Sequence, residues 1–268
     1  MTILRRGDVG AGVRELQRLL NARGASLELT AEFDAATLAA VQSAQARYGL
    51  VMDGAAGPKT LAALQRDEKR PEHLTAADLQ RAADKLGVPL AVVRAVNEVE
   101  SRGAGFLPDG RPVILFERHI MYRQLREAGH DADALARKYP NLVNPQRGGY
   151  VGGAGEYSRL AQAGAIDEPC ALSSASWGAF QVMGYHWYRL HYLSMEAFVV
   201  CMRSSEGAQL DAFVRFVLAD PAVHKALKAR KWSTFASLYN GPAYKENLYD
   251  VKLARAFARY EAEEKEPA

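Results

Sequence analysis

Apolar residues recur at helical spacing in three segments near the amino terminus. In the first segment, Val13, Leu16 and Leu20 share one helical face. A second helix is expected after the capping residue Asp34, and a third after the glycine-rich turn at residues 49–60. Three short amphipathic helices predict a small helical domain with a core of its own.

A charged stretch separates this domain from the rest of the chain. Residues 66–74 have no large apolar side chain before their last position, which is typical of a linker between domains. We therefore predict a first domain over residues 1–65 and a second over residues 75–268. Thr75 and Asp78 have the spacing of a capping box that opens the next helix.

The pattern of the second domain is mostly helical to about residue 262. Residues 103–117 are the exception, because a Pro-Asp-Gly turn at residues 108–110 precedes an apolar strand at residues 113–116. The predicted fold class is therefore mainly α. A small three-helix domain is followed by an α-rich domain with a small β-hairpin.

Glu100 interrupts an apolar face at the end of a predicted helix. Val92, Val96 and Val99 lie on that face, and Glu100 follows Val96 by four residues. Lost hydration disfavours a charged carboxylate, so we expect a pKa above the usual value and a proton available near neutral pH. Such an acid suits glycosidic bond cleavage. The alternative is a buried glutamate that only satisfies backbone groups or an arginine.

Composition excludes several classes of protein. The 268 residues are 49% hydrophobic and 24% charged, as in a globular protein of one or two domains. A net charge of +3 is too small to argue for nucleic acid, although it is compatible with an anionic polymer such as cell wall. Cys170 and Cys201 are the only cysteines, so neither a disulfide framework nor a paired metal-ligand spacing is present. We expect no cofactor and a monomer.

No targeting or membrane segment is expected. Arg5 and Arg6 are not followed by the apolar stretch of a secretory signal. The longest apolar run, residues 197–202, is too short to span a bilayer. These features predict synthesis in the cytoplasm without a signal peptide.

Four short motifs of the second domain carry candidate chemistry. They are a helix-end Glu-Ser pair, a carboxylate that ends a strand, a small-residue segment with tryptophan and glutamine, and a Tyr-Asn-Gly-Pro helix break. Cleavage of a carbohydrate needs a proton donor, a second carboxylate, aromatic faces and amide groups. In chain order the candidates are Glu100 and Ser101, Glu117, Ser176 with Trp177 and Gln181, and Tyr239 with Asn240.

The first domain resembles the three-helix peptidoglycan-binding domain of bacterial and phage cell-wall hydrolases. Residues 4–17 read Leu-x-x-Gly-x-x-Gly-x-x-Val-x-x-Leu-Gln, and residues 53–60 read Asp-Gly-x-x-Gly-x-x-Thr. The first and second helices also share a template, which reads Val-x-x-Leu-Gln-x-x-Leu at residues 13–20 and Val-x-x-Ala-Gln-x-x-Tyr at residues 41–48. The resemblance implies a wall-binding module in which Asp53, Gly57 and Thr60 take part.

The second domain resembles the phage N-acetylmuramidases of the lysozyme superfamily. The motifs are Glu-Ser-Arg-Gly-x-Gly-Phe-Leu-Pro-x-Gly-Arg-Pro at residues 100–112, Ile-Leu-Phe-Glu-Arg-His at 114–119 and Ser-Trp-Gly-x-Phe-Gln-Val-Met-Gly at 176–184. The resemblance implies an endolysin that cleaves the β-1,4 bond of peptidoglycan glycan strands and acts on the wall after release. It implies that Glu100 is the acid, that Glu117 is the second carboxylate, and that Ser101, Ser176, Trp177, Gln181, Tyr239 and Asn240 line the glycan groove.

Alternatives remain open at this point. A lytic transglycosylase shares most of these motifs, and a wall-binding virion protein without activity would share the first domain. Glu117 is as well suited to a structural anchor as to catalysis, Trp177 and Tyr239 could be core aromatics, and Gln181 could satisfy backbone groups. As a catalytic base on a separate strand, Glu117 would favour inversion. A zinc amidase built on His119, His186, His191 and Cys170 is disfavoured by their spacing.

Overall fold

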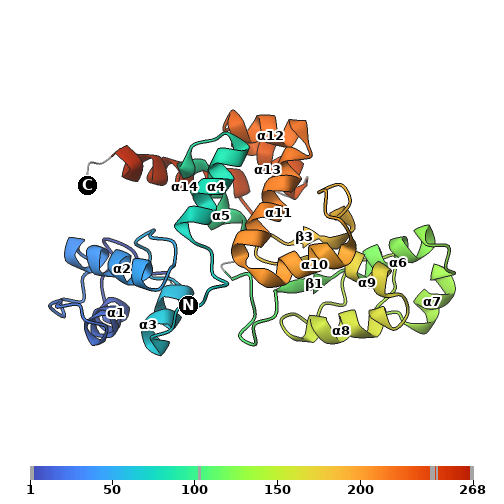
Figure 1. Ribbon diagram of the computed structural model, residues 1–268, viewed down its shortest axis with the longest axis horizontal. Helices are drawn as coiled ribbons and strands as arrows, with labels where there is room; N and C mark the ends of the chain where they lie inside the picture. The colour runs from blue at the N-terminus through green and yellow to red at the C-terminus, as the bar shows by residue number, and fades with distance from the viewer. Residues whose placement is uncertain (1–2, 102–103, 242–244, 246, 266–268) are drawn as a thin grey trace. The chain divides into compact units, whose positions relative to one another are not determined.

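The structure, a computed structural model, divides the chain into two compact units, Met1–Leu79 and Gln80–Ala268 (Figure 1). The division falls inside helix α4 (Ala76–Leu86), a few residues after the predicted domain start at residue 75. Thr75 and Asp78 form the expected capping box, with each side chain accepting from the other residue's backbone N–H. The structure describes residues 3–101, 104–241, 245 and 247–265.

The first unit contains the three predicted helices. They are α1 (Ala11–Ala22), α2 (Ala35–Arg47) and α3 (Pro58–Arg66). The Asp34 carboxylate caps α2 by accepting from the Thr37 N–H at 2.7 Å. The core of this unit includes Val13, Leu16, Leu20, Phe33, Val41, Tyr48, Leu50 and Leu64.

Two buried glutamines explain the repeated sequence template of α1 and α2. The Gln17 Oε1 accepts from the Ala31 N–H at 3.1 Å, in the turn after α1. The Gln45 Oε1 accepts from the Gly54 N–H at 2.9 Å, and its Nε2 donates to the Asp53 carboxylate at 2.7 Å. Each glutamine therefore holds the turn that follows its own helix, and satisfies backbone groups that burial would otherwise leave without partners.

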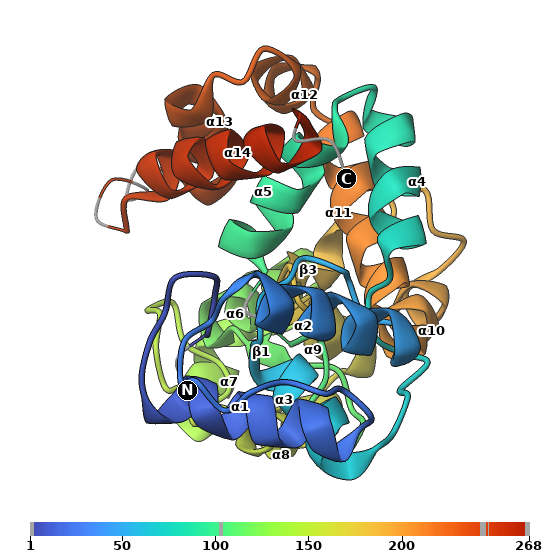
Figure 2. The ribbon, with the colours of Figure 1, turned by 90° about the vertical axis from the view of Figure 1, so that its left-hand side faces the viewer.

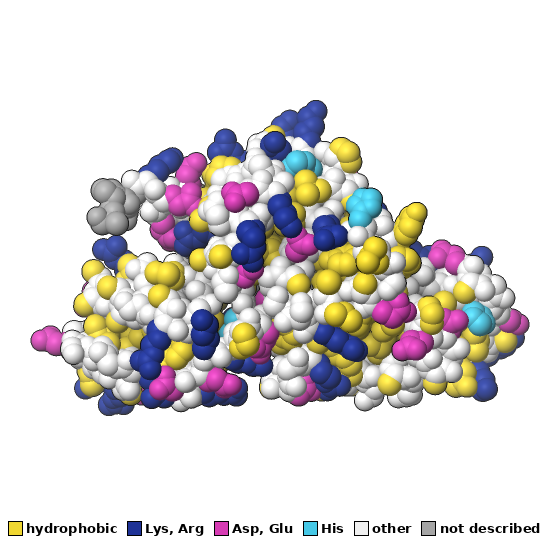
Figure 3. Space-filling model, in the orientation of Figure 1, with side chains coloured by type: hydrophobic (Ala, Val, Ile, Leu, Met, Phe, Trp, Pro, Cys, Tyr) yellow, Lys and Arg dark blue, Asp and Glu magenta, His cyan; other side chains and the backbone are white. Residues whose placement is uncertain are grey.

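The second unit is α-rich, as predicted. Figure 3 shows charged side chains of both signs interspersed over one face, in keeping with the net charge of +3. After α4, its helices are α5 (Leu90–Glu100), α6 (Arg118–Glu127), α7 (Ala132–Lys138), α8 (Gly155–Gly164), α9 (Glu168–Ser173), the 3-10 helix η1 (Gly184–His186), α10 (Met195–Ser204), α11 (Glu206–Leu218), α12 (Pro221–Lys228), α13 (Trp232–Asn240) and α14 (Tyr249–Lys265).

A small antiparallel sheet accompanies these helices. Strand β1 (Ile114–Phe116) confirms the predicted apolar strand, and it pairs with β2 (Ala175–Trp177), which pairs in turn with β3 (Val182–Met183). Strands β2 and β3 come from a segment that the sequence pattern did not identify as strands. They are three and two residues long, so local propensity carries little signal there.

Helix α5 packs along α14, a neighbour from the far end of the chain (Figure 2). Ala91 and Ala95 of α5 share a buried cluster with Ala256 and Tyr260 of α14. Polar contacts follow the same seam, because the Tyr260 hydroxyl donates to the Glu98 carboxylate at 2.6 Å. The small alanines let the helices approach closely, and this packing holds the end of α5 in place.

Candidate active site

A pocket of about 410 Å³ in the second unit contains the side chain of Glu100. Glu100 is the last residue of α5, and it is half-buried. It is the one carboxylate among the described residues that line the pocket, whose other walls are mainly aromatic. The full lining is Glu100, Phe180, Gln181, Val182, Met183, Tyr185, His186, Phe216, Tyr239 and Tyr249.

Tyr239 lines this pocket, as predicted, and lies close enough to Glu100 to feel its charge. Burial, and then the negative charge of the Glu100 carboxylate, raise the pKa of Tyr239. Its hydroxyl therefore keeps its proton at neutral pH and donates to the Phe180 carbonyl at 3.2 Å. The ring is also held edge-on to Phe216, with 5.6 Å between centroids. Tyr239 is thus a rigid aromatic wall beside Glu100.

Gln181 also lines the pocket, but its amide is already engaged. Its Nε2 donates to the Gly178 carbonyl at 2.8 Å, and its Oε1 accepts from the Ser176 hydroxyl at 2.9 Å. Ser176 itself is only 5% exposed. We therefore correct the predicted role of Ser176: because it is buried behind Gln181, it orients that amide and does not contact a glycan.

Trp177 requires a second correction. It is completely buried in β2, and its indole N–H donates to the Leu172 carbonyl at 3.3 Å. All three residues of β2 are buried, because η1 and α9 pack against this strand. A side chain without exposed surface cannot stack on a sugar ring, so Trp177 is a core aromatic.

The remaining predicted groove residues lie at helix ends. Ser101 caps α5 immediately after Glu100 and is half-buried. Asn240 ends α13, and its side chain lies outside the described part of the structure. Sequence reasoning missed Phe216 and Tyr249 as lining residues. Both lie on helices with ordinary patterns, so only the fold brings them to Glu100.

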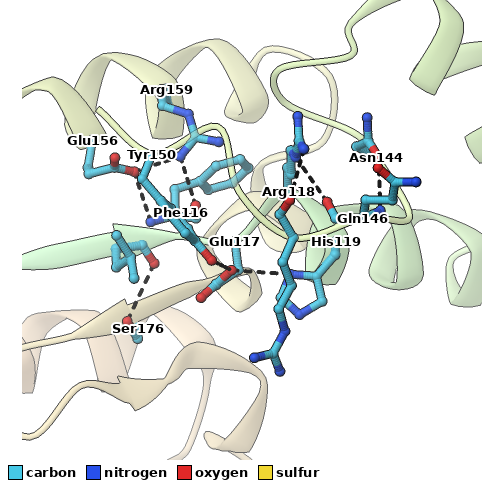
Figure 4. A network of polar contacts seen from close by, with 12 residues as sticks. Phe116, Glu117, Arg118, His119, Asn144, Gln146, Tyr150, Glu156, Arg159 and Ser176 are labelled. Atoms are coloured by element: carbon cyan, nitrogen blue, oxygen red, sulfur yellow. Dashed lines mark hydrogen bonds and ion pairs between the residues drawn. The ribbon is translucent and has the colours of Figure 1, made fainter. Parts of the chain in front are cut away.

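Glu117 belongs to a separate polar network at the start of α6 (Figure 4). The Tyr150 hydroxyl donates to its carboxylate at 2.7 Å. The His119 Nδ1 lies 3.1 Å from the same oxygen, although it is not aligned for a hydrogen bond. Burial lowers the pKa of His119, against the attraction of Glu117. Glu117 is not one of the side chains that line the pocket of Glu100.

A buried ion pair supports the strand that ends at Glu117. The Glu156 carboxylate accepts from the N–H groups of Phe116 at 3.1 Å and Gly152 at 2.8 Å, and from the Arg159 guanidinium at 2.7 Å. Burial opposes its charge, but the amides of Gly152, Val151 and Phe116 together hold the pKa of Glu156 below its usual value. The pair ties β1 to α8 and so places Glu117 (Figure 4).

Gln209 of α11 ties the loop after Glu100 to the turn between β2 and β3. Its Oε1 accepts from the Ala179 N–H at 2.8 Å, and its Nε2 donates to the Gly105 carbonyl at 3.2 Å. Glu206 accepts from the Gly105 N–H at 2.7 Å. A Cβ atom at Gly105 would lie 2.1 Å from the Gln209 Oε1, and one at Gly178 would lie 2.5 Å from its Cδ. Only glycine fits on either side of this amide.

The predicted wall-binding residues of the first unit lie around the turn before α3. Asp53 accepts from Gln45 and from the Ala55 N–H at 2.9 Å, and Gly57 caps α3. Thr60 is 4% exposed, with its hydroxyl 3.4 Å from the Gln45 Nε2. We correct the prediction for Thr60, because a buried side chain stabilises the turn and cannot contact the wall. Wall contact by Asp53 and Gly57 stays a prediction.

The fold does not assemble the residues of the zinc alternative. In the described ranges, no three histidine, cysteine, aspartate or glutamate side chains are grouped so that they could hold a metal ion. Cys170 is buried, and burial together with Asp167 raises the pKa of its thiol to about 12. It is therefore a protonated core thiol at neutral pH. None of the helices that the structure describes is long and apolar enough to cross a bilayer.

Both units match known protein families. Residues 89–261 match the N-acetylmuramidase family, and residues 9–64 match a peptidoglycan binding domain. The chain is 62% identical to a Burkholderia AP3 phage endolysin of known crystal structure. The similarity covers 97% of this chain and 100% of that one, with a TM-score of 0.90.

A curated relative is similar over a shorter region. The zinc D-Ala-D-Ala carboxypeptidase of Streptomyces albus G is 42% identical over 84 residues, which cover 29% of this chain. The match spans 33% of the length of that protein. It therefore extends over a part of each chain and carries no argument about zinc here.

Proposed function

Because the chain belongs to the N-acetylmuramidase family, we propose that Glu100 is the acid with which this peptidoglycan hydrolase works. Glu100 would protonate the bridging oxygen of the β-1,4 bond between N-acetylmuramic acid and N-acetylglucosamine. The observation that carries the proposal is the position of Glu100, as the one carboxylate among the described residues of an aromatic pocket.

The surroundings of Glu100 suit a proton donor. A carboxyl group at the carboxyl end of a helix meets the negative pole of the helix dipole, which disfavours its charged form. Half-burial acts in the same direction, because it removes hydration from the charge. The rings of Tyr239, Phe216 and Tyr249 offer faces on which sugars stack. Together these groups favour a protonated acid beside a bound glycan.

For Glu117 we propose the second catalytic role, activation of the attacking water. Its carboxylate is held by the Tyr150 hydroxyl, and only 16% of its side chain is exposed. If Glu117, at the start of α6, holds a water on the face of the sugar opposite the acid, the configuration inverts. The same contacts with Tyr150 and His119 also suit a structural anchor.

The first unit is proposed to keep the enzyme on its insoluble substrate. Its match to a peptidoglycan binding domain supports wall contact, and tethering raises the local concentration of the catalytic unit at the glycan. By similarity to the phage endolysin, we propose that the protein lyses bacterial cells. It would act as a monomer at the cell wall.

The test of Glu100 is the Glu100→Gln variant, which keeps the shape of the side chain and removes the acid. General acid catalysis contributes about 10²- to 10⁴-fold, so clearance of a peptidoglycan suspension should slow by at least that range. Co-sedimentation with purified walls should be unchanged. Clearance at the original rate would refute the role of Glu100. No clearance by the unaltered chain would instead favour a wall-binding protein without activity.

Mass spectrometry of the released muropeptides distinguishes hydrolysis from transglycosylation. Family membership favours hydrolysis, in which one water molecule is added across each cleaved bond, its hydroxyl to the anomeric carbon and its hydrogen to the leaving oxygen. A lytic transglycosylase would leave 1,6-anhydro ends that are lighter by one water. Anhydro products as the main species would overturn the assignment as a muramidase while leaving the acid role of Glu100 intact.

A further inference from the structure

His186 lines the same pocket as Glu100, although no part of the mechanism above uses it. It ends η1, where its half-buried ring lies 4.3 Å from the Tyr185 ring and edge-on to the Phe216 ring at 5.1 Å. These contacts orient the imidazole without engaging its nitrogens. In the part of the chain that the structure describes, no hydrogen bond joins either nitrogen to another protein group.

The ring is uncharged at neutral pH. Burial, followed by the positive charges of Arg189 and Arg123, lowers the pKa of His186 to about 4. A neutral imidazole has one nitrogen that donates a hydrogen bond and one that accepts. Buried polar groups are ordinarily hydrogen-bonded, so we expect these two nitrogens to form hydrogen bonds with a ligand in the pocket.

The N-acetyl groups of the substrate complement the two imidazole nitrogens of His186. Both sugars of peptidoglycan carry an N-acetyl group, whose amide offers one N–H donor, one carbonyl acceptor and an apolar methyl. The imidazole complements the amide, and the neighbouring rings of Tyr185 and Phe216 offer apolar contact for the methyl.

We propose that His186 binds the N-acetyl group of the sugar held in the pocket of Glu100, and thereby selects N-acetylated over N-deacetylated glycan. This inference rests on the proposed function, because it assumes that the pocket holds peptidoglycan sugars. His186 is a substrate-binding residue here and takes no part in proton transfer.

The test compares the binding of two matched ligands. The trimer of N-acetylglucosamine and its N-deacetylated counterpart are titrated into the full chain carrying Glu100→Gln, so that nothing is cleaved. Adding His186→Phe keeps an aromatic ring and removes both hydrogen-bonding nitrogens. One lost hydrogen bond corresponds to about tenfold in affinity. We expect the preference for the acetylated trimer to fall about tenfold, and His186→Gln to restore part of it.

His191 provides the matched control, because it is an exposed histidine in the same segment and does not line the pocket. His191→Asn should leave the preference unchanged. An unchanged preference in His186→Phe, or an equal loss of affinity for both trimers, overturns the inference. Wall cleavage by the chain with Glu100 intact is measured in parallel. Cleavage together with an unchanged preference rejects this inference alone, whereas absent cleavage rejects the proposed function.

Discussion

The carboxylate of Glu117 lies between Tyr150 and His119. Variants of Glu117 and Tyr150 distinguish a role as catalytic base from a role as structural anchor. If Glu117 activates water, Glu117→Gln should lower kcat by about 10²- to 10⁴-fold with little change in KM or in thermal stability. The measurement is initial velocity on soluble glycan fragments, together with the melting temperature of each variant.

If Glu117 is only an anchor, the outcome differs. Glu117→Gln would then lower the melting temperature, because the Tyr150 hydroxyl loses a charged acceptor, while kcat would fall only a few-fold. Tyr150→Phe is the matched variant, since it removes the same hydrogen bond and leaves the carboxylate. Equal effects of both changes on kcat would contradict a role as base.

At the level of single residues, the sequence identified the carboxylate of the pocket better than the residues that line it. Glu100 was identifiable because a carboxylate within an apolar helical face is an anomaly of the local pattern. Trp177 and Ser176 were misassigned because their motif does not reveal that both faces of β2 are covered. His186 and Phe216 were missed for the opposite reason, since nothing local marks them as neighbours of Glu100.

Among the elements, β1 depends on the ion pair between Glu156 and Arg159. The pKa of Glu156 is held below its ordinary value of 4.5 in the folded protein. The carboxylate therefore stabilises the fold fully above that value, and this contribution is lost as the pH falls through the folded pKa. We expect the melting temperature to drop steeply below about pH 4.5.

The variant Glu156→Gln isolates this contribution. Removing one partner of a buried ion pair costs about 3–5 kcal/mol, so the free energy of unfolding at neutral pH should fall by that order. The melting temperature of this variant should also fall less steeply in acid than that of the unaltered chain. Glu127→Gln, on the exposed side of α6, is the control and should change stability by less than about 1 kcal/mol. If the melting temperature of Glu156→Gln fell with pH in the same way as that of the unaltered chain, the role of Glu156 would be contradicted.

Helices were predictable from the sequence and the sheet was only partly so, for a physical reason. A helix satisfies its backbone within one segment, so periodicity and caps such as Asp34 and Thr75 mark it locally. Strand β1 also has an apolar pattern. Its partner β2 is short and distant in sequence, so this pairing depends on tertiary packing.

At the scale of the whole molecule, each unit has its own core, which predicts that wall binding and cleavage can be lost separately. Gln45→Leu should unfold or loosen the first unit, because it removes the partners of Asp53 and Gly54. Retention on insoluble walls should fall, while cleavage of soluble glycan fragments should persist. Gln65→Leu, at an exposed position of α3, is the matched control.

The measurements are co-sedimentation with walls and initial velocity on soluble fragments, made on the same preparation. A parallel loss of both properties in Gln45→Leu would show that the catalytic unit depends on the first unit. Unchanged retention would show that the turn held by Gln45 is not needed for wall contact.

The amide of Gln209 has a consequence for recombining enzymes of this kind. Gly105, Gly178 and Gln209 lie far apart along the chain. The two glycines leave the space that the Gln209 amide occupies. If a crossover replaced either glycine by a larger residue while Gln209 stayed, the new side chain would collide with the Gln209 amide. Chimeras should therefore inherit all three positions from one parent, whereas exchange of the first unit leaves this trio intact.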